Sequence, residues 1–419
     1  MTPTVPAVQD APLVPGDPSV PGYDAVLLAG FGGPEGPDDV MPFLRNVTRG
    51  RGIPEERLVE VSHHYQALGG ASPINEQNRR LRAALETELG RRGIGMRVLW
   101  GNRNWAPYLP DVLTEAHARG QVRLLGLATS AYSSYSGCRQ YREDFGMALA
   151  GTGLVGSVRI DKVRPYFDRP GFRQPFAEGT IDAVRTATAA GIELADLAIV
   201  FTTHSIPLTM ADTSGSADLG DHRSGGAYVS QHLAVAGAVI EQVTAELGRS
   251  PDWQLAYQSR SGPPSVPWLD PDINDVITDL AAAGRAGVIV VPIGFVSDHV
   301  EVVWDLDNEA AETAAEHGLF FARVPTPGVD PRFVAELADL VAERLGATDG
   351  AAPSGTSGGG LTGAARRPDF CAAGCCANAR LTRPTTAAVD SAADWAGQDV
   401  EPAQLAASGI RGTRKPLSR

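Results

Sequence analysis

The regular alternation of short apolar runs with longer amphipathic stretches is the feature that most constrains the fold. Runs rich in Val, Ile, Leu and Ala predict strands at 24–29, 96–100, 122–128, 197–203, 254–258 and 287–293. Hydrophobic residues at helical spacing predict helices at 54–68, 74–92, 180–190 and 230–248. Strands joined through helices form parallel sheets covered by helices on both faces. The chain is therefore expected to be an α/β protein.

A chain of 419 residues is long enough for two such units. We expect two doubly wound, Rossmann-like domains, at 23–185 and 186–346, each with its own parallel sheet. The remaining segments are a disordered, proline-rich leader at 1–22, a flexible Gly- and Ser-rich linker at 347–368, a cysteine-rich segment at 369–382 and a polar tail at 383–419.

The charge and the cysteine content exclude several classes of protein. A formal net charge of −13 argues against a general binder of nucleic acid or anionic membranes, which needs a basic face. The most apolar run, 287–296, is much shorter than the roughly 20 residues of a membrane-spanning helix. Four cysteines do not make a disulfide scaffold in a chain of this length. We therefore expect a cytoplasmic protein with reduced thiols.

A glycine-rich turn, Gly30–Gly36, directly follows the first predicted strand. Such a turn can cradle a phosphate at the start of a helix. The spacing, however, differs from G-x-G-x-x-G, and Pro34 lacks a backbone N–H. The preferred interpretation is a tight strand-to-helix turn that lets a bulky group approach the backbone.

His204 stands where the strand predicted at 197–203 ends. Ligands of open α/β sheets lie beyond the carboxyl ends of the strands, and a neutral imidazole can accept a proton or bind a metal near pH 7. The alternative is a loop histidine that is hydrogen-bonded to the backbone. Among the eight histidines, His204 has the context most typical of a site.

Glu301, Asp305 and Glu309 follow the strand predicted at 287–293 at intervals of four residues. On a helix this spacing places three carboxylates on one stripe, where like charges destabilise the helix unless a cation or solvent offsets them. A solvated acidic face is the alternative. A row of hard oxygen ligands can bind or relay a divalent cation such as ferrous iron. Because His204 and Glu301 both stand at strand ends, we expect them to converge on one cleft.

Three of the four cysteines, Cys371, Cys375 and Cys376, lie close together after the linker, and Cys138 is far upstream. Four thiolates can complete a tetrahedral zinc site or a [2Fe–2S] cluster. The adjacent Cys375 and Cys376 suit a cluster with two irons better than a single zinc ion. The alternative is four unrelated buried thiols.

Five segments, taken in order, resemble the ferrochelatase family over residues 23–346. They are Leu27–Gly36 (LLAGFGGPEG), Gly69–Asn75 (GGASPIN), Gly101–Trp105 (GNRNW), Thr203–Pro207 (THSIP) and Ser297–Glu301 (SDHVE). The set looks most like the actinobacterial branch, whose members are coproporphyrin ferrochelatases and often carry a [2Fe–2S] cluster. The resemblance implies two α/β domains with a porphyrin cleft between them.

The resemblance also implies roles for residues of the second half. His204 matches the family's catalytic histidine and Glu301 its partner carboxylate. Asp305 and Glu309 match an acidic row proposed to pass metal or protons. All four side chains are therefore candidate contacts for Fe²⁺.

In the first half, Ser72 and Tyr141 match positions that contact the porphyrin. Phe31 stands where some coproporphyrin enzymes have a tyrosine that reaches the metal; phenylalanine cannot ligate but can stack on the macrocycle. Arg49 and Arg51 are candidates for binding propionate groups.

The four cysteines match the cluster ligands of the family in kind. The C-x3-CC spacing differs from that of animal enzymes, which makes Cys138 the least secure ligand.

The expected activity is the insertion of Fe²⁺ into coproporphyrin III in haem biosynthesis, with a coproheme decarboxylase as a downstream partner. One alternative is a protoporphyrin IX ferrochelatase or another tetrapyrrole chelatase, because histidine with carboxylate does not select iron over cobalt or nickel. An alternative of another class is a non-catalytic iron–sulfur redox sensor or haem-binding protein.

Overall fold

The computed structural model describes residues 22–50, 52–215, 225–262, 265–346, 374–377, 383 and 385. The expected leader and linker, most of the expected tail, and the candidate residues Arg51 and Cys371 lie outside this part of the chain.

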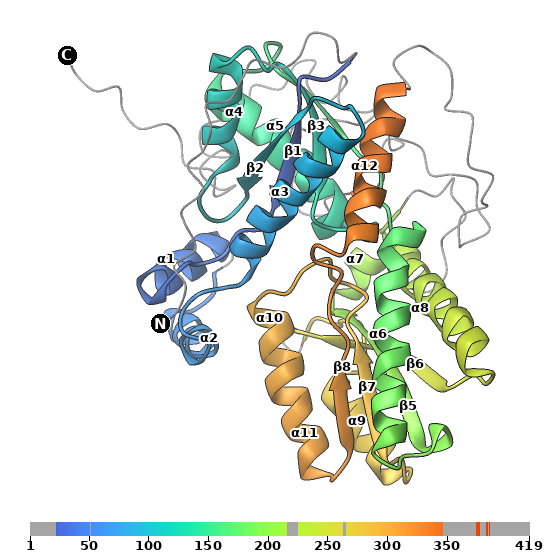
Figure 1. The fold of residues 1–419 in the computed structure, drawn as a ribbon. Coiled ribbons are helices and arrows are strands. Elements are labelled where there is room, and N and C mark those ends of the chain that lie inside the picture. The colour runs from blue at the N-terminus through green and yellow to red at the C-terminus, as the bar shows by residue number, and fades with distance from the viewer. Residues whose placement is uncertain are drawn as a thin grey trace, which may run out of the picture.

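Two four-stranded parallel sheets form the cores of the two halves, one above the other in Figure 1. The first sheet has the order β2–β1–β3–β4 and the second the order β6–β5–β7–β8. The strands are β1 Ala25–Gly30, β2 Arg97–Asn102, β3 Arg123–Ala128, β4 Arg159–Lys162, β5 Leu197–His204, β6 Asp252–Gln258, β7 Gly287–Val291 and β8 Phe320–Arg323. The expected α/β fold with two parallel sheets is confirmed. The short edge strands β4 and β8 were not predicted.

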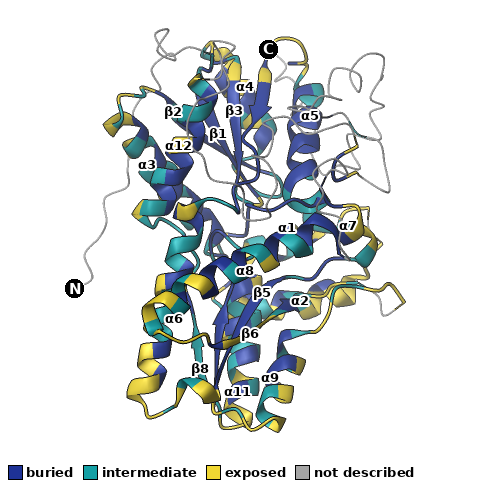
Figure 2. Ribbon diagram, turned by 90° about the vertical axis from the view of Figure 1, so that its right-hand side faces the viewer, coloured by how far each residue is buried: buried dark blue, intermediate teal, exposed yellow. Residues whose placement is uncertain are grey.

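Helices flank each sheet, with their buried faces turned inward (Figure 2). In the first half they are α1 Pro37–Val47, α2 Glu55–Ala67, α3 Ile74–Arg91, α4 Leu109–Ala118 and α5 Gln140–Thr152, which follows the π-helical turn η1 Tyr135–Arg139. Further along the chain are α6 Pro170–Ala189, α7 Leu208–Asp212, α8 Gly226–Leu247, α9 Ile273–Ala282, α10 Val300–Val302, the π-helix η4 Val303–Ala310, α11 Ala311–Glu316 and α12 Pro331–Gly346.

The two faces of each sheet pack in separate apolar clusters, as β1 illustrates. Val26 and Leu28 point to the side covered by α3, whereas Ala25 and Leu27 point to the side covered by α4 and α5. Successive strand residues face opposite sides, so a strand covered on both sides is apolar throughout. This is why the central strands β1, β3, β5 and β7 appear in the sequence as mostly apolar runs.

The two halves share one large apolar cluster, which joins residues of β1 and β5 and extends through α12. Helix α12 lies at the end of the second half, yet it packs against α3 of the first half as well as α6 (Figure 1). Helix α6 contains the expected boundary near residue 185 and packs against α8 and β7. Tyr132 donates a hydrogen bond across the halves to the Ile293 carbonyl at 2.9 Å.

The strand order positions the functional site. In the first sheet, the strand that follows β1 in the chain, β2, pairs with one edge of β1, and β3 pairs with the other edge. The chain connections therefore run in opposite directions from a point between β1 and β3, and the same holds between β5 and β7 in the second sheet. Ligands of open α/β sheets bind beyond the carboxyl ends of the strands at such a point. The segments that follow these four strands are therefore the expected location of the functional site.

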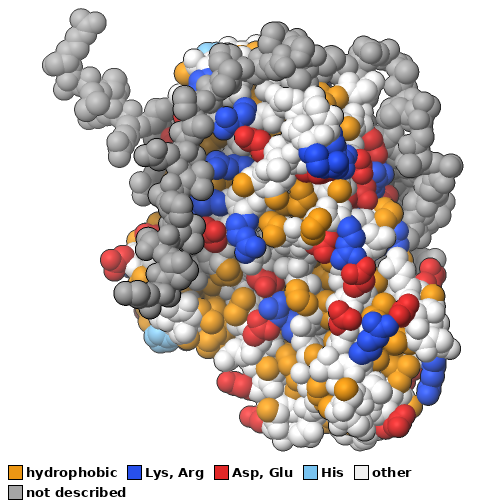
Figure 3. Space-filling view, viewed as in Figure 1, with side chains coloured by type: hydrophobic (Ala, Val, Ile, Leu, Met, Phe, Trp, Pro, Cys, Tyr) orange, Lys and Arg blue, Asp and Glu red, His pale blue; other side chains and the backbone are white. Residues whose placement is uncertain are grey.

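The surface carries charges of both signs close to one another (Figure 3). Many of them are paired; Arg323, for example, contacts Asp298 and Asp307. No helix within the described residues is both long and apolar enough to cross a membrane.

Candidate active site

His204 is the last residue of β5, and its imidazole faces Glu301. Its Nδ1 contacts the Ser205 carbonyl oxygen, which can only accept a hydrogen bond, so Nδ1 carries the proton in the neutral ring. Nε2 is then the atom with a lone pair, and it lies 3.6 Å from Glu301 Oε2. The predicted convergence of the histidine and the carboxylate is thus present, with the basic nitrogen turned toward the carboxylate.

A second histidine, His299, lies on the other side of the same carboxylate. Its Nδ1 is 4.0 Å from Glu301 Oε2. Burial lowers the pKa of His299, and the nearby His204 adds to this effect, while the charge of Glu301 opposes it. His299 was not predicted as a site residue, although it stands two residues before Glu301 in the same segment.

Asp305 and Glu309 continue from Glu301 along the π-helix η4, and each is held by a different group. Ser259 Oγ donates a hydrogen bond to Asp305 Oδ2, and Gln258 Nε2 donates a longer one at 3.4 Å. Trp304 Nε1 donates to Glu309 Oε1 at 2.8 Å. Asp305 and Glu309 are therefore held in place along the row, whereas the Glu301 side chain is 50% exposed.

The environment of Asp305 raises its pKa to about 7. Burial is the largest cause, the hydrogen bond from Ser259 opposes it, and the charges of Glu301 and Glu309 raise the pKa further. Ser259 has a φ of 61°, a conformation that is uncommon outside glycine and concentrates at functional sites. Asp305 is thus a carboxyl group that can take up and release a proton near neutral pH.

Phe31, Ser72 and Tyr141 lie around the strand ends of the first sheet. A Cβ on Gly33 would come within 2.7 Å of Ser72 Cβ, so the glycine-rich turn sits directly on Ser72. The Arg103 guanidinium lies 4.5 Å from the centre of the Tyr141 ring and 5.9 Å from that of Phe31. Arg103 therefore links two of the expected porphyrin contacts.

Arg103 forms a nearly buried ion pair with Asp144, with Nε 2.5 Å from Oδ2. Burial raises the pKa of Asp144, although the charge of Arg103 opposes this shift. Arg103 belongs to the Gly101–Trp105 segment that resembles the family, but no role was predicted for it. Its partners are far away in the sequence, so no local pattern indicates its role.

Helices α1 and α2 connect the two halves of the site. The Phe43 ring of α1 packs edge-on against Phe31, with ring centres 6.3 Å apart, and belongs to the same apolar cluster as Val300. His64 of α2 stacks on Trp304 of η4 at 4.4 Å. The loop that carries Phe31 and the helical segment of Val300 and Trp304 thus both pack against this pair of helices.

The cysteine segment contacts both halves. Cys138, on the first half, is buried, as are Cys375 and Cys376, whose sulfur atoms are 3.9 Å apart. Arg142 Nη2 donates a hydrogen bond to the Cys375 carbonyl at 3.3 Å, and the Gly215 N–H donates to Cys376 Sγ at 3.1 Å. Residues 374–377 therefore lie between α5 and the segment that follows α7.

Other predicted contacts are not gathered into the site. Arg49 is exposed after the end of α1. Among the described residues, no group of three or more His, Cys, Asp or Glu side chains has an arrangement that could hold a metal ion.

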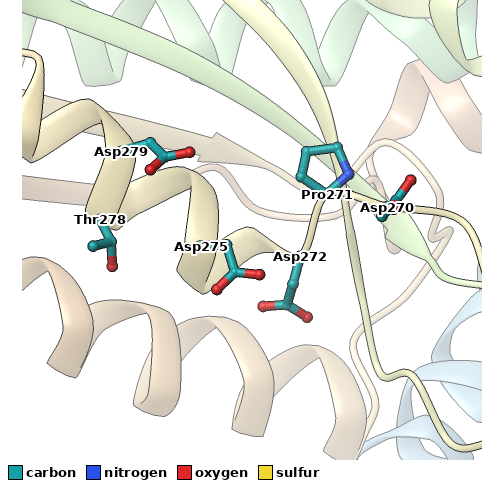
Figure 4. Close-up of a pocket in the computed structure, with 6 residues that line it drawn as sticks. All are labelled: Asp270, Pro271, Asp272, Asp275, Thr278 and Asp279. Carbon is teal, nitrogen blue, oxygen red and sulfur yellow. The ribbon is translucent and has the colours of Figure 1, made fainter. Parts of the chain in front are cut away.

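An open acidic depression of about 540 Å³ lies at the start of α9. Its lining residues are Asp270, Pro271, Asp272, Asp275, Thr278 and Asp279 (Figure 4). Burial raises the pKa of Asp272, and the charges of Asp275 and Glu309 add to this effect. The depression thus adjoins the outer end of the carboxylate row.

These features define the class of the protein. One parallel sheet carries a histidine–carboxylate pair near its strand ends, and the other carries aromatic residues around the nearly buried Arg103, as in an α/β enzyme whose site lies beyond the carboxyl ends of its strands. The sequence profile of the ferrochelatase family matches residues 23–345. The chain therefore belongs to the ferrochelatase family, as the sequence predicted.

Curated relatives are similar over most of the chain. A coproporphyrin III ferrochelatase of Leifsonia xyli is 56% identical over 367 residues, which cover 86% of this chain and 92% of that protein. One of Streptomyces griseus is 52% identical over 88% of this chain and 97% of its own. One of Mycolicibacterium smegmatis is 49% identical over 77% and 90%, respectively.

Proposed function

We propose that this protein inserts Fe²⁺ into coproporphyrin III to give Fe-coproporphyrin, a step of haem biosynthesis. Relatives with this name are about half identical to the chain over most of its length. The observation that carries the proposal is the orientation of His204, whose basic Nε2 faces Glu301 at 3.6 Å. Protoporphyrin IX is the alternative substrate.

Insertion requires that two pyrrole protons leave the porphyrin as Fe²⁺ enters. We assign the acceptance of a pyrrole proton to His204 Nε2. Glu301, 3.6 Å away, stabilises the resulting imidazolium by charge attraction. Since the pKa of Asp305 is about 7, Asp305 can accept the proton in turn and pass it toward Glu309 and solvent.

The same carboxylates offer oxygen ligands to the incoming iron. Ferrous iron is bound by imidazole and carboxylate, and the row Glu301, Asp305 and Glu309 supplies carboxylates in sequence. The two positive charges of an Fe²⁺ ion that moves inward along the row are balanced by two protons that move outward. In this proposal iron is a substrate that binds transiently to His204 and the three carboxylates.

On the opposite side, Phe31, Ser72 and Tyr141 are proposed to contact the macrocycle. Phe31 is 38% exposed, so part of its side chain is accessible for contact with a macrocycle. Binding that holds the ring away from planarity exposes the pyrrole nitrogens and so lowers the barrier.

The cysteines fit a [2Fe–2S] cluster in their chemistry. Cys138, Cys375 and Cys376 are buried, and the Gly215 N–H already donates a hydrogen bond to the Cys376 sulfur. We propose that they hold the cluster together with Cys371. When bound, such a cluster supplies a covalent connection between the segment and the body of the enzyme, and a centre that can carry an electron.

The proposed function also includes a downstream partner and a cellular location. The product is proposed to pass to a decarboxylase that acts on its propionate groups. The enzyme is proposed to work in the cytoplasm, which cell fractionation tests directly.

An anaerobic insertion assay tests the proposed function. Fe²⁺ with coproporphyrin III is compared with protoporphyrin IX, and with Co²⁺ and Ni²⁺. We expect turnover with coproporphyrin III and Fe²⁺, and its loss in His204→Ala while porphyrin binding stays measurable by fluorescence. Turnover by His204→Ala would remove the histidine from the mechanism. No turnover with any pairing would favour a non-catalytic haem-binding or redox protein.

A further inference from the structure

Tyr228, near the start of α8, holds the end of the strand that carries His204. Its hydroxyl donates a hydrogen bond to the His204 carbonyl at 2.8 Å and accepts one from the Thr203 hydroxyl at 2.7 Å. The side chain is buried, so water does not replace these bonds. Because β5 ends at His204, the two bonds set the direction in which the backbone leaves the sheet. They therefore also influence where the imidazole points.

The first turn of α8 is tied to the end of α7. Ser214 Oγ accepts a hydrogen bond from the Tyr228 N–H at 2.8 Å and donates one to the Ala211 carbonyl at 2.5 Å. Gly226, the first residue of α8, has a φ of +59° and packs against α7 so closely that a Cβ there would come 2.1 Å from the Ala211 oxygen. This close packing allows Tyr228 to move only together with the segment around Ser214.

The cysteine segment is attached to the residue next to Ser214. The Gly215 N–H donates to Cys376 Sγ at 3.1 Å, and the Cys376 N–H donates to the Gly215 carbonyl at 3.3 Å. Cys376 has a φ of 53°, a conformation that a residue other than glycine keeps only where its surroundings hold it. A continuous series of contacts thus leads from Cys376 to His204.

We propose that Tyr228 is a positioning residue for His204, and that the cysteine segment, residues 374–377, holds Tyr228 in place through Gly215 and Ser214. The inference rests on the proposed role of His204 in metal insertion. Loss of the Cys376 contact releases the start of α8, weakens the Tyr228–His204 bond and moves the imidazole relative to Glu301. Small displacements of a reacting group cost large factors in rate, on the order of a hundredfold per ångström.

The test combines Tyr228→Phe, Cys376→Ala and the double variant in the full chain. We expect Tyr228→Phe to lower kcat about tenfold with the KM for coproporphyrin III unchanged, because the hydrogen bonds of this hydroxyl within the described part of the chain go to the strand that carries His204. Cys376→Ala should lower kcat about threefold and speed hydrogen exchange over residues 225–232. Because both act on one feature, adding Cys376→Ala to Tyr228→Phe should have no further effect.

A buried tyrosine at the opposite end of the first sheet provides the control. Tyr23 also makes two hydrogen bonds through its hydroxyl, to Asp161 and with Arg344, so Tyr23→Phe removes a similar group far from His204. It should change stability without changing kcat. If Tyr228→Phe does not fold, Ser214→Ala replaces it, because that variant keeps the tyrosine hydroxyl and removes its anchor.

Two results would overturn the proposal. One is independent, multiplying effects of the two substitutions on kcat. The other is unchanged hydrogen exchange at the start of α8 in Cys376→Ala. The exchange measurement needs no turnover, so it decides the structural coupling even if the wild-type protein inserts no metal and the proposed function itself fails.

Discussion

Replacing Ser259 with alanine is expected to raise the pKa of Asp305 and to shift the pH dependence of metal insertion toward alkaline pH. The Ser259 hydroxyl donates a hydrogen bond to the Asp305 carboxylate and holds its pKa down, whereas burial and the charges of Glu301 and Glu309 raise it to about 7. Gln258 donates only a longer bond, at 3.4 Å. The substitution therefore removes the stronger of the two bonds that favour the ionised form.

The magnitude follows from the charge on the acceptor. A hydrogen bond to a charged group contributes about 1.5–3 kcal/mol, and about 1.4 kcal/mol corresponds to one pKa unit. Because Gln258 still donates a hydrogen bond to the carboxylate in the variant, we take the low end, a shift from about 7 to about 8. At pH 7 the ionised fraction of Asp305 then falls from about one half to about one tenth, and insertion should slow about fivefold.

Initial rates of anaerobic insertion between about pH 5.5 and about pH 9 measure this shift. The acidic limb of the profile should move up by about one unit in Ser259→Ala, with the rate recovered at high pH. Ser250→Ala, at the other end of β6, is the control and should leave the profile unchanged. An acidic limb that stays in place, or moves toward acid, would refute the assignment of Asp305 to the proton path.

Three further substitutions separate stability, binding and attachment of the tail. Asp305→Asn should abolish most insertion yet stabilise the fold at pH 8. The wild-type carboxyl has its pKa raised from 3.8 to about 7, so its ionisation lowers the free energy of unfolding progressively as the pH rises through that range, by up to about 4 kcal/mol. Urea unfolding should show about half of this regained in the variant, because the hydrogen bonds from Ser259 and Gln258 weaken. Gly33→Ala should raise the Kd for coproporphyrin about tenfold, because its Cβ would meet Ser72 at 2.7 Å, whereas Gly36→Ala, with no atom within 4 Å, should bind normally; equal affinities would contradict this packing. Cys375→Ser should lose visible cluster absorbance and lower Tm by at least about 3 °C, and unchanged melting would exclude a clamping role.

Most of the fold was predictable because it depends on short, buried strands. Strands β1, β2, β3, β5, β6 and β7 were predicted to within two residues of their ends. The central strands β1, β3, β5 and β7 are mostly apolar and almost fully buried, whereas only the second half of β6 is buried. Strands β4 and β8 were missed. Each has four residues at a sheet edge, and Arg159, Asp161 and Lys162 hide the apolar pattern of β4.

The candidate site was predictable where its residues follow strands. His204 and Glu301 were expected to converge because parallel strands place their carboxyl ends at one edge, and the structure puts them 3.6 Å apart. Arg103 and Ser259 were missed because their partners, Asp144 and Asp305, are more than forty residues away and reach them only after folding.

Local patterns in the sequence thus determined the two parallel sheets and the strand ends at which the site lies. Hydrophobic periodicity depends only on near neighbours, and strand order follows from short right-handed crossovers. Tertiary structure alone decided that Asp305 titrates near pH 7 and that Cys376 connects through Gly215 to the strand of His204. Burial, charge and hydrogen bonding at these points come from segments far apart in the chain, so only their packing sets the proton affinity and position of the reactive groups.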